Sequence, residues 1–258
     1  MNQEHPLRIA IAGALGRMGG AVAATAATRP DVTVAARFDR PGATDPALIA
    51  MESALTACDV VIDFSAPTAS AALATLSAGQ DNPPALVIGS TGFDALQEEA
   101  IARAASRVAI VKAGNFSLGV NMLLGLVRQA AAALPAHDWD IEVFEAHHKR
   151  KIDAPSGTAL MLGRAAAQGR GSALAEPVSL DRNGTRTTAE IGFSVLRGGG
   201  IIGEHSVTFA SENEILTLSH SARDRSLFAN GALAAAVWVR AQPPGLYDMQ
   251  DVLGFSRG

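Results

Sequence analysis

The feature that most constrains the fold lies near the N-terminus, where an apolar run leads directly into a glycine-rich stretch. Residues 7–12 predict a buried strand, and the glycines that follow are spaced G-x-x-G-x-x-G. Residues 21–28 then predict a helix and residues 32–36 a second strand. A strand, a glycine turn, a helix and a strand in this order are typical of a dinucleotide-binding βαβ unit.

The glycine turn is the first candidate binding site. Glycines there allow a tight turn and bring a pyrophosphate close to the N–H groups of the helix start. The spacing departs from the stricter G-x-G-x-x-G, and a plain turn is the alternative. The residues predicted to contact the cofactor are Gly13, Ala14, Leu15, Gly16, Arg17 and Met18.

An acidic and a basic residue follow the second predicted strand. Asp39 is well placed to accept hydrogen bonds from ribose hydroxyls, whereas Arg40 could hold a 2′-phosphate. The pair leaves both NADH and NADPH open as the cofactor. A turn is the simpler interpretation, since Pro41 and Gly42 come next, and the two interpretations are compatible.

Strands and helices continue to alternate up to about residue 121. Strands are predicted at 60–64, 85–88 and 108–111, with helices at 67–78 and 95–105. This alternation predicts an α/β fold with a doubly wound parallel sheet, in which ligands bind beyond the carboxyl ends of the strands. Further cofactor contacts are therefore expected at Gly89, Ser90, Thr91, Ala113, Gly114, Asn115 and Phe116.

The pattern changes in the second half of the chain. A helix at 122–134, a strand at 141–144 and a helix near 158–168 precede strands at 190–196, 201–210 and 215–219. Successive strands without helices predict an α+β domain with a mixed open sheet. We expect residues 1–121, completed by 225–258, to bind the dinucleotide. Residues 122–224 are expected to bind substrate and to form an oligomer through the sheet.

Five consecutive residues that can carry positive charge, at positions 147–151, lie in a chain of net charge −4. Next comes a predicted helix start, where Ser156 or Thr158 can cap and the free N–H groups attract anions. This combination favours a site for a carboxylate-bearing small molecule. The alternatives are a solvated face, a nucleic-acid patch and a zinc site. The pI near 5.9 argues against nucleic-acid binding. A zinc site is disfavoured because the two histidines have no third ligand at a familiar spacing.

Composition narrows the class of protein. Hydrophobic residues make up 48% of the chain and aromatic residues only 5%, and no apolar stretch is long enough to span a membrane. The N-terminus does not resemble a signal peptide. The single Cys58 excludes an internal disulfide and precedes a predicted strand, so we expect a core residue. A cytoplasmic enzyme of small-molecule metabolism fits these features.

The basic segment belongs to a longer motif, from Glu145 to Ala159, that resembles the 4-hydroxy-tetrahydrodipicolinate reductase (dihydrodipicolinate reductase) family. Supporting matches extend over nearly the whole chain. They are residues 13–19, 62–65, 89–93, 115–121, 203–205 and 228–231, together with Arg197. Two departures are a shortened stretch between Asp39 and Asp63, and Ala66 where some relatives carry a basic residue; the second bears on NADH-versus-NADPH preference.

The resemblance implies a reaction and roles for particular residues. It implies reduction of a cyclic imine dicarboxylate by NADH or NADPH in the diaminopimelate route to lysine, without a metal, by a homotetramer. His147 and Lys151 match the family's catalytic pair, with the proton donor between them left open. His148, Ser156, Gly157 and Thr158 match its substrate-binding residues.

Three other functions fit the sequence less well. An acylating dehydrogenase would need a nucleophilic cysteine, and Cys58 lies near no catalytic motif. A non-catalytic dinucleotide sensor could keep the glycine turn but would not need both His147 and Lys151. A nucleic-acid-binding protein is disfavoured by the overall charge.

Overall fold

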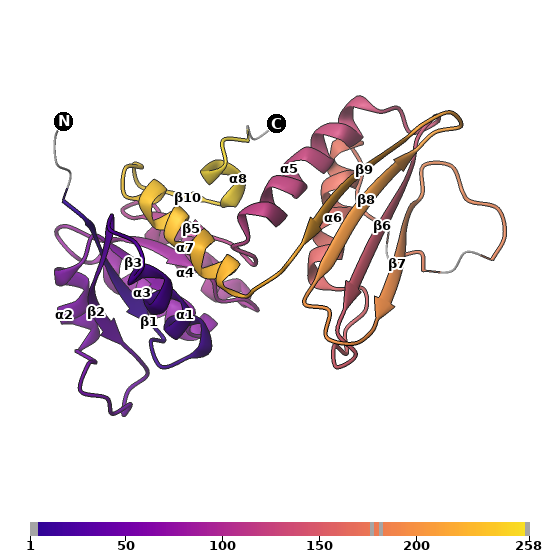
Figure 1. Cartoon of the computed structure of the whole chain (residues 1–258). Coiled ribbons are helices and arrows are strands. Elements are labelled where there is room, and N and C mark those ends of the chain that lie inside the picture. Colours follow the sequence, from indigo (N-terminus) through magenta and orange to yellow (C-terminus); the bar gives the residue numbers. More distant parts are fainter. Residues whose placement is uncertain (1–4, 176–177, 181–182, 256–258) are drawn as a thin grey trace. The chain divides into compact units, whose positions relative to one another are not determined.

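The computed structural model describes residues 5–175, 178–180 and 183–255. The chain forms two compact units. Unit 1 comprises Met1–Leu118 and Ser226–Gly258, and unit 2 comprises Gly119–Arg225. Each unit has its own sheet (Figure 1). The last long helix, α7 (Ser226–Val239), belongs to unit 1, so the chain leaves that unit and returns to it.

Unit 1 is built on a six-stranded sheet in which every pairing is parallel. Its order, β10-β5-β4-β3-β1-β2, reverses direction beside β1, as in doubly wound sheets. The predicted Rossmann-like fold is therefore confirmed. The strands are β1 (Leu7–Ala12), β2 (Val32–Phe38), β3 (Val60–Asp63), β4 (Ala85–Ile88), β5 (Ala109–Lys112) and β10 (Gly245–Tyr247).

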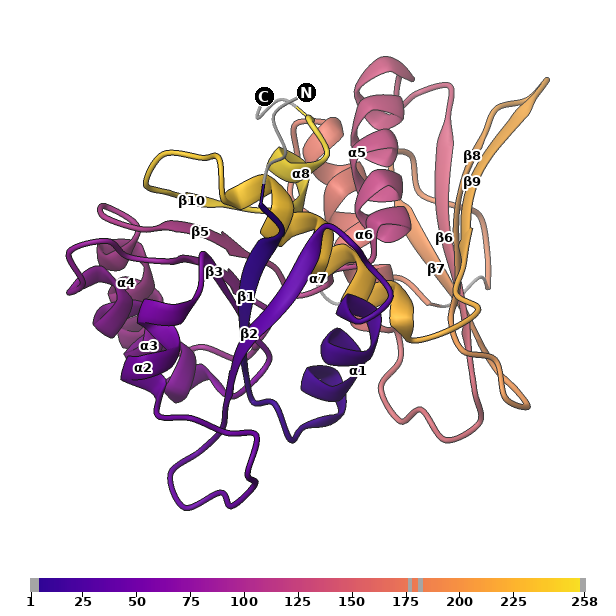
Figure 2. The same cartoon turned by 60° about the vertical axis from the view of Figure 1, so that its left-hand side comes forward.

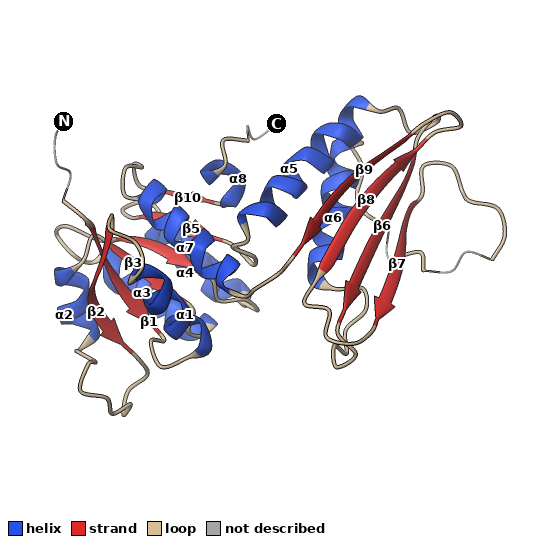
Figure 3. Cartoon of the chain, viewed as in Figure 1, coloured by secondary structure: helices blue, strands red, loops and turns tan. Residues whose placement is uncertain are grey.

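Helices cover both faces of this sheet (Figures 2 and 3). One hydrophobic cluster joins the sheet to α1 (Arg17–Ala26), α7 and the short α8 (Met249–Val252). The other joins it to α2 (Met51–Ala57), α3 (Pro67–Ala78) and α4 (Ala95–Ala104). Apolar side chains point to both sides of β1, which explains its nearly continuous apolar sequence.

Local signals set several helix starts in unit 1. Asp94 accepts a hydrogen bond from the Gln97 N–H, and the Gln97 side chain returns one to Asp94, which forms a capping box at α4. Pro67 occupies the first turn of α3, where no N–H partner is needed. Helix α1 begins at Arg17, earlier than the predicted residue 21, and α2, α8 and β10 were not predicted.

Unit 2 is an α+β unit with a four-stranded sheet in the order β7-β6-β8-β9. Strands β6 (Asp140–His147) and β7 (Ile191–Arg197) are parallel, whereas β8 (Glu204–Ala210) and β9 (Ile215–Ser221) join antiparallel. The predicted mixed sheet is therefore confirmed. Helices α5 (Leu118–Ala133) and α6 (Gly157–Gly169) cover one face around a single apolar cluster (Figure 3).

The opposite face of this sheet carries no helix of unit 2 among the described residues (Figure 1). Alternation along β9 points Leu216 and Leu218 toward the helices and Ile215 and Thr217 away from them. Ile215 is 70% exposed. Across residues 5–175, 178–180 and 183–255, no helix is long and apolar enough to cross a membrane.

Candidate active site

The basic segment forms the loop between β6 and α6. Strand β6 ends at His147, and α6 begins at Gly157. Within the loop, the Nζ of the partly buried Lys151 lies 2.8 Å from Asp153 Oδ2. The side chains of the two preceding bases, residues 149 and 150, are exposed. The five basic residues therefore differ in burial, because Lys151 is partly buried whereas residues 149 and 150 are exposed.

Beneath this loop lies Glu145, whose side chain is 1% exposed. Its Oε1 accepts hydrogen bonds from Arg197 Nη2 at 2.7 Å and from the Ser156 N–H at 2.9 Å. Its Oε2 accepts one from Arg197 Nη1 at 2.7 Å and lies 2.5 Å from His147 Nδ1. The carboxylate therefore meets four donor groups from three residues.

Two effects compete in setting the charge of Glu145. Burial acts to raise its pKa, but the hydrogen bonds from Arg197, His147 and the Ser156 N–H outweigh burial and hold the pKa below its ordinary value. The same pairing raises the pKa of Arg197. The site thus contains a buried ion pair with well-matched donors and acceptors.

A second histidine packs against this group from β8. His205 is 6% exposed, and its ring lies 5.1 Å from the His147 ring, edge to face. Its Nε2 is 3.1 Å from the Ser156 Oγ. Burial, followed by the electrostatic effect of the neighbouring His147, lowers the pKa of His205 to about 4, so His205 is neutral at physiological pH.

The start of α6 is the predicted anion-binding element. Of the two capping candidates, Ser156 is the N-cap, and its Oγ accepts a hydrogen bond from the Ala159 N–H at 3.2 Å. Ser156 is also buried. Gly157 is exposed, and a Cβ built on it would meet nothing within 4 Å. The first turn of α6 therefore leaves room for a ligand at Gly157.

The glycine turn of unit 1 has the geometry of a phosphate-binding loop. Gly13 has a φ of +68°, and a Cβ on Gly19 would lie 2.3 Å from the Gly13 oxygen. Helix α1 therefore packs directly on the turn, as the third glycine of such a motif requires. The N-cap Gly16 has no side-chain hydrogen bond to the helix, and Leu15, Gly16 and Arg17 are exposed. This cradle fits a pyrophosphate.

Asp39 follows β2 beside the same turn. Its Oδ2 accepts a hydrogen bond from the Leu15 N–H at 2.8 Å, and its Oδ1 accepts one from the Arg40 N–H at 2.8 Å. The Arg40 side chain is exposed. The structure thus brings the predicted ribose-binding acid to the predicted pyrophosphate loop, where each carboxylate oxygen already has one backbone donor.

The ends of β4 and β5 are adjacent, as parallel pairing requires. A Cβ on Gly114 would come within 3.8 Å of the Thr91 side chain. Ser90 is buried, and its hydroxyl bonds that of Ser70 at 2.8 Å. Phe116 is also buried, and its ring packs edge to face on that of Phe64.

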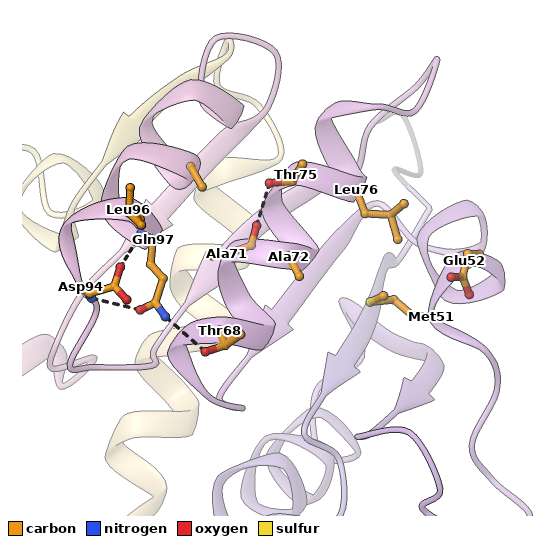
Figure 4. A pocket seen from close by; sticks show the side chains of 11 residues that line it. Met51, Glu52, Thr68, Ala71, Ala72, Thr75, Leu76, Asp94, Leu96 and Gln97 are labelled. Atoms are coloured by element: carbon orange, nitrogen blue, oxygen red, sulfur yellow. Dashed lines mark hydrogen bonds between the residues drawn. The ribbon is translucent and has the colours of Figure 1, made fainter.

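A separate hollow of about 630 Å³ lies between α2, α3 and α4 (Figure 4). Its wall is mostly apolar, and Gln97 bridges Asp94 and Thr68 at one end. None of the predicted site residues lines it. In the described part of the chain, no group of three or more His, Cys, Asp or Glu side chains could hold a metal ion.

Comparison with known proteins assigns the family. Residues 7–116 match the family model for "Dihydrodipicolinate reductase, N-terminus", and residues 119–253 match that for "Dihydrodipicolinate reductase, C-terminus". The chain belongs to the dihydrodipicolinate reductase family. The resemblance inferred from the sequence is therefore confirmed, and with it the enzyme class, an NAD(P)H-dependent oxidoreductase.

Relatives within the dihydrodipicolinate reductase family align over nearly their full lengths. The 4-hydroxy-tetrahydrodipicolinate reductase of Caulobacter vibrioides is 66% identical over 98% of this chain and 100% of its own. That of Rhizobium rhizogenes is 48% identical over 98% of both chains. A dipicolinate-bound dihydrodipicolinate reductase from Paenisporosarcina sp. TG-14 has the same fold, with a TM-score of 0.79 at 24% identity over 95% of this chain and 98% of its own.

Three residues of the site received no individual role from the sequence: Glu145, Arg197 and His205. Glu145 and His205 lie inside stretches that carried the family resemblance, and Arg197 was itself one of the matching residues. One local signal pointed to Glu145, because it occupies a core-facing position of β6, in phase with the buried Ile141 and Val143. A charged residue in that phase needs a buried partner.

Proposed function

We propose that the chain reduces 4-hydroxy-tetrahydrodipicolinate to tetrahydrodipicolinate, with NADH or NADPH, in the diaminopimelate route to lysine. The observation that carries the proposal is the loop from His147 to Gly157, where two candidate proton donors and an open helix start follow one buried carboxylate. The name of the 66% identical relative supports the same substrate.

Unit 1 is proposed to bind the nucleotide. The turn has the positive φ and close helix packing that a pyrophosphate site requires, and Asp39 lies beside it. The exposed Arg40 offers a partner for a 2′-phosphate. The remaining proposed contacts are Ala14, Leu15, Gly16, Arg17 and Met18 in the turn, with Gly89, Ser90, Thr91, Ala113, Gly114, Asn115 and Phe116 beyond β4 and β5.

Unit 2 is proposed to bind the dicarboxylate substrate. Gly157 and Thr158 hold one carboxylate at the helix start, where backbone N–H groups and the helix dipole favour an anion. His148 contributes a further contact from the loop. Ser156 supports this site indirectly, because its buried hydroxyl caps α6 and sets the position of the first turn of the helix.

A bound nicotinamide would supply the hydride that reduces the ring, and the 4-hydroxyl of the substrate leaves as water. The protein residues supply the proton and the charge that holds the substrate. His147 and Lys151 are the proposed proton-donating pair, and Lys151 also attracts a carboxylate. The Asp153 carboxylate, 2.8 Å from the Lys151 Nζ, keeps that side chain oriented until a substrate carboxylate competes for it.

The decisive experiment follows oxidation of NADH and NADPH by the purified protein. The substrate is generated in the cuvette from pyruvate and aspartate semialdehyde by the enzyme that precedes this step. Substrate-dependent oxidation is expected with at least one cofactor. A folded protein that binds cofactor but oxidises none would contradict the proposal.

We also propose a cytoplasmic homotetramer assembled through the open sheet face of unit 2. The exposed Ile215 and Leu196 lie on that face, and burial against a second copy would remove them from water. Sedimentation should give a tetramer for the wild type and smaller species for Ile215→Asp. Leu96→Asp, an exposed leucine of unit 1, is the control. A monomeric wild type would contradict the assembly.

A further inference from the structure

Glu145 and Arg197 form a bidentate pair between two neighbouring strands, 52 residues apart in sequence. The two acceptor–donor distances are both 2.7 Å. Each partner also makes contacts that lead toward the proposed proton donors. The pair therefore does more than neutralise two charges.

The contacts of Glu145 lead to His147. Its Oε2 lies 2.5 Å from His147 Nδ1, and an ionised carboxylate can only accept a hydrogen bond there. Nδ1 must then carry a hydrogen in both protonation states of the ring. The proton that His147 gains or loses is confined to Nε2.

The free side of the His147 ring faces Gly203. A Cβ on Gly203 would lie only 3.3 Å from His147 Nε2, so glycine at this position keeps the proton-carrying nitrogen uncovered. The His205 ring packs against the His147 ring, edge to face, with the two centroids 5.1 Å apart.

The contacts of Arg197 lead to Lys151. Its Nη2 also donates to the Asp153 backbone oxygen at 2.7 Å, and the Asp153 carboxylate pairs with the Lys151 Nζ. The guanidinium thus anchors the loop that carries the second proposed proton donor. A lysine at position 197 could not reach both the carboxylate and this carbonyl in the same geometry.

We propose that the buried Glu145–Arg197 pair is a positioning device for both proton donors. Glu145 fixes the tautomer and orientation of His147, and Arg197 holds the Lys151 loop in place. Neither residue touches the reacting atoms. The expected effect on kcat rests on the proposed function, whereas the expected tautomer of His147 does not.

The tautomer is tested first on the wild-type protein by nitrogen NMR of labelled histidine, without substrate. The neutral His147 ring is expected to carry its hydrogen on Nδ1. A hydrogen on Nε2 instead would overturn the role of Glu145. This measurement needs no variant and no turnover, so it stays informative if the substrate assignment fails.

The kinetic test compares Glu145→Gln with Glu142→Gln. Glu142 also lies on β6 and pairs with an arginine, at 2.9 Å to Arg186, but it faces the other side of the sheet. Glutamine at 145 offers one acceptor oxygen to four donors. We expect kcat to fall about 10- to 100-fold, with the KM and the cofactor Kd changed less than about threefold. Glu142→Gln should retain wild-type kcat.

A double-mutant cycle separates positioning from mere structural damage. In a His147→Ala background, Glu145→Gln should lose most of its effect on kcat, because the group through which it acts is absent. An equal loss of kcat in both backgrounds, or a kcat in Glu145→Gln within about threefold of wild type, would overturn the proposal. If the wild type turned over no substrate, the proposed function would fail while the NMR result remained valid.

Discussion

The Asp39 carboxylate accepts a hydrogen bond from the Leu15 N–H, 24 residues earlier in the chain, at 2.8 Å. This bond links the end of β2 to the glycine turn. An acid expected to serve ribose hydroxyls therefore also braces the turn expected to hold the pyrophosphate. Its second oxygen accepts a hydrogen bond from the Arg40 N–H, so both carboxylate oxygens are held in place before any ligand binds.

Asp39→Ala should weaken binding of both reduced cofactors, and of NADH more than NADPH. Losing the brace affects both, whereas losing the ribose acceptor affects chiefly the cofactor without a 2′-phosphate. We expect the NADH Kd to rise about tenfold or more, the equivalent of one or two hydrogen bonds to a charged group. Fluorescence titration of each cofactor without substrate measures this. The matched variant Arg40→Ala should weaken NADPH alone; equal losses for both cofactors in Asp39→Ala would contradict the ribose role.

Gly19→Ala should damage the turn, whereas Gly20→Ala should not. A Cβ at Gly19 would lie 2.3 Å from the Gly13 oxygen, which is backbone and cannot rotate away. At the next position a Cβ meets nothing within 4 Å. We expect Gly19→Ala to lower the unfolding free energy by about 1–3 kcal/mol and Gly20→Ala to raise it by up to about 1 kcal/mol. Urea unfolding of both variants measures these free energies. Similar unfolding free energies for the two variants would contradict the close packing of α1 on the glycine turn.

Lys151→Ala should cut kcat about 100-fold or more while leaving cofactor affinity unchanged, because a proton donor would be lost from unit 2 and not from the nucleotide turn. Steady-state kinetics and cofactor titration together measure the two effects. Lys149→Ala, whose exposed side chain is two residues away, is the control and should retain activity. A collapse of cofactor affinity in Lys151→Ala would show that the loop serves the nucleotide instead.

His205 should make the folded state less stable as the pH falls. Burial lowers its pKa to about 4 in the folded state, compared with about 6.5 when unfolded, so the unfolded chain binds the proton more readily. The stability that the neutral His205 contributes to the folded state is present in full above a pH of about 6.5 and is lost as the pH falls toward about 4. Between pH of about 7.5 and about 5 the loss should be about 2 kcal/mol.

Urea unfolding at these two pH values, for wild type and His205→Gln, measures the contribution of His205. The variant should show a pH dependence smaller by about this amount. His220 also has a lowered pKa, caused chiefly by burial, and this residue is present in both proteins. An identical pH dependence in the variant would contradict the burial-lowered pKa of His205.

Much of the fold was predictable because its signals are local. The apolar run of β1, the glycine turn and the capping residues Asp94 and Ser156 each act within a few residues of themselves. The missed elements lacked such signals. Strand β10 spans only Gly245–Tyr247 and exists because it pairs with β5 across more than a hundred residues.

By itself, therefore, the sequence determined the order of strands and helices, the glycine turn, the basic loop and the family. Only the tertiary structure decided which buried charges meet. Glu145 meets Arg197, 52 residues later, because β6 pairs with β7, and Ser156 at the start of α6 meets His205 of β8, 49 residues later. Periodicity and turn chemistry are read within a few residues, whereas a buried carboxylate is stabilised by whichever donors the sheet register places beside it.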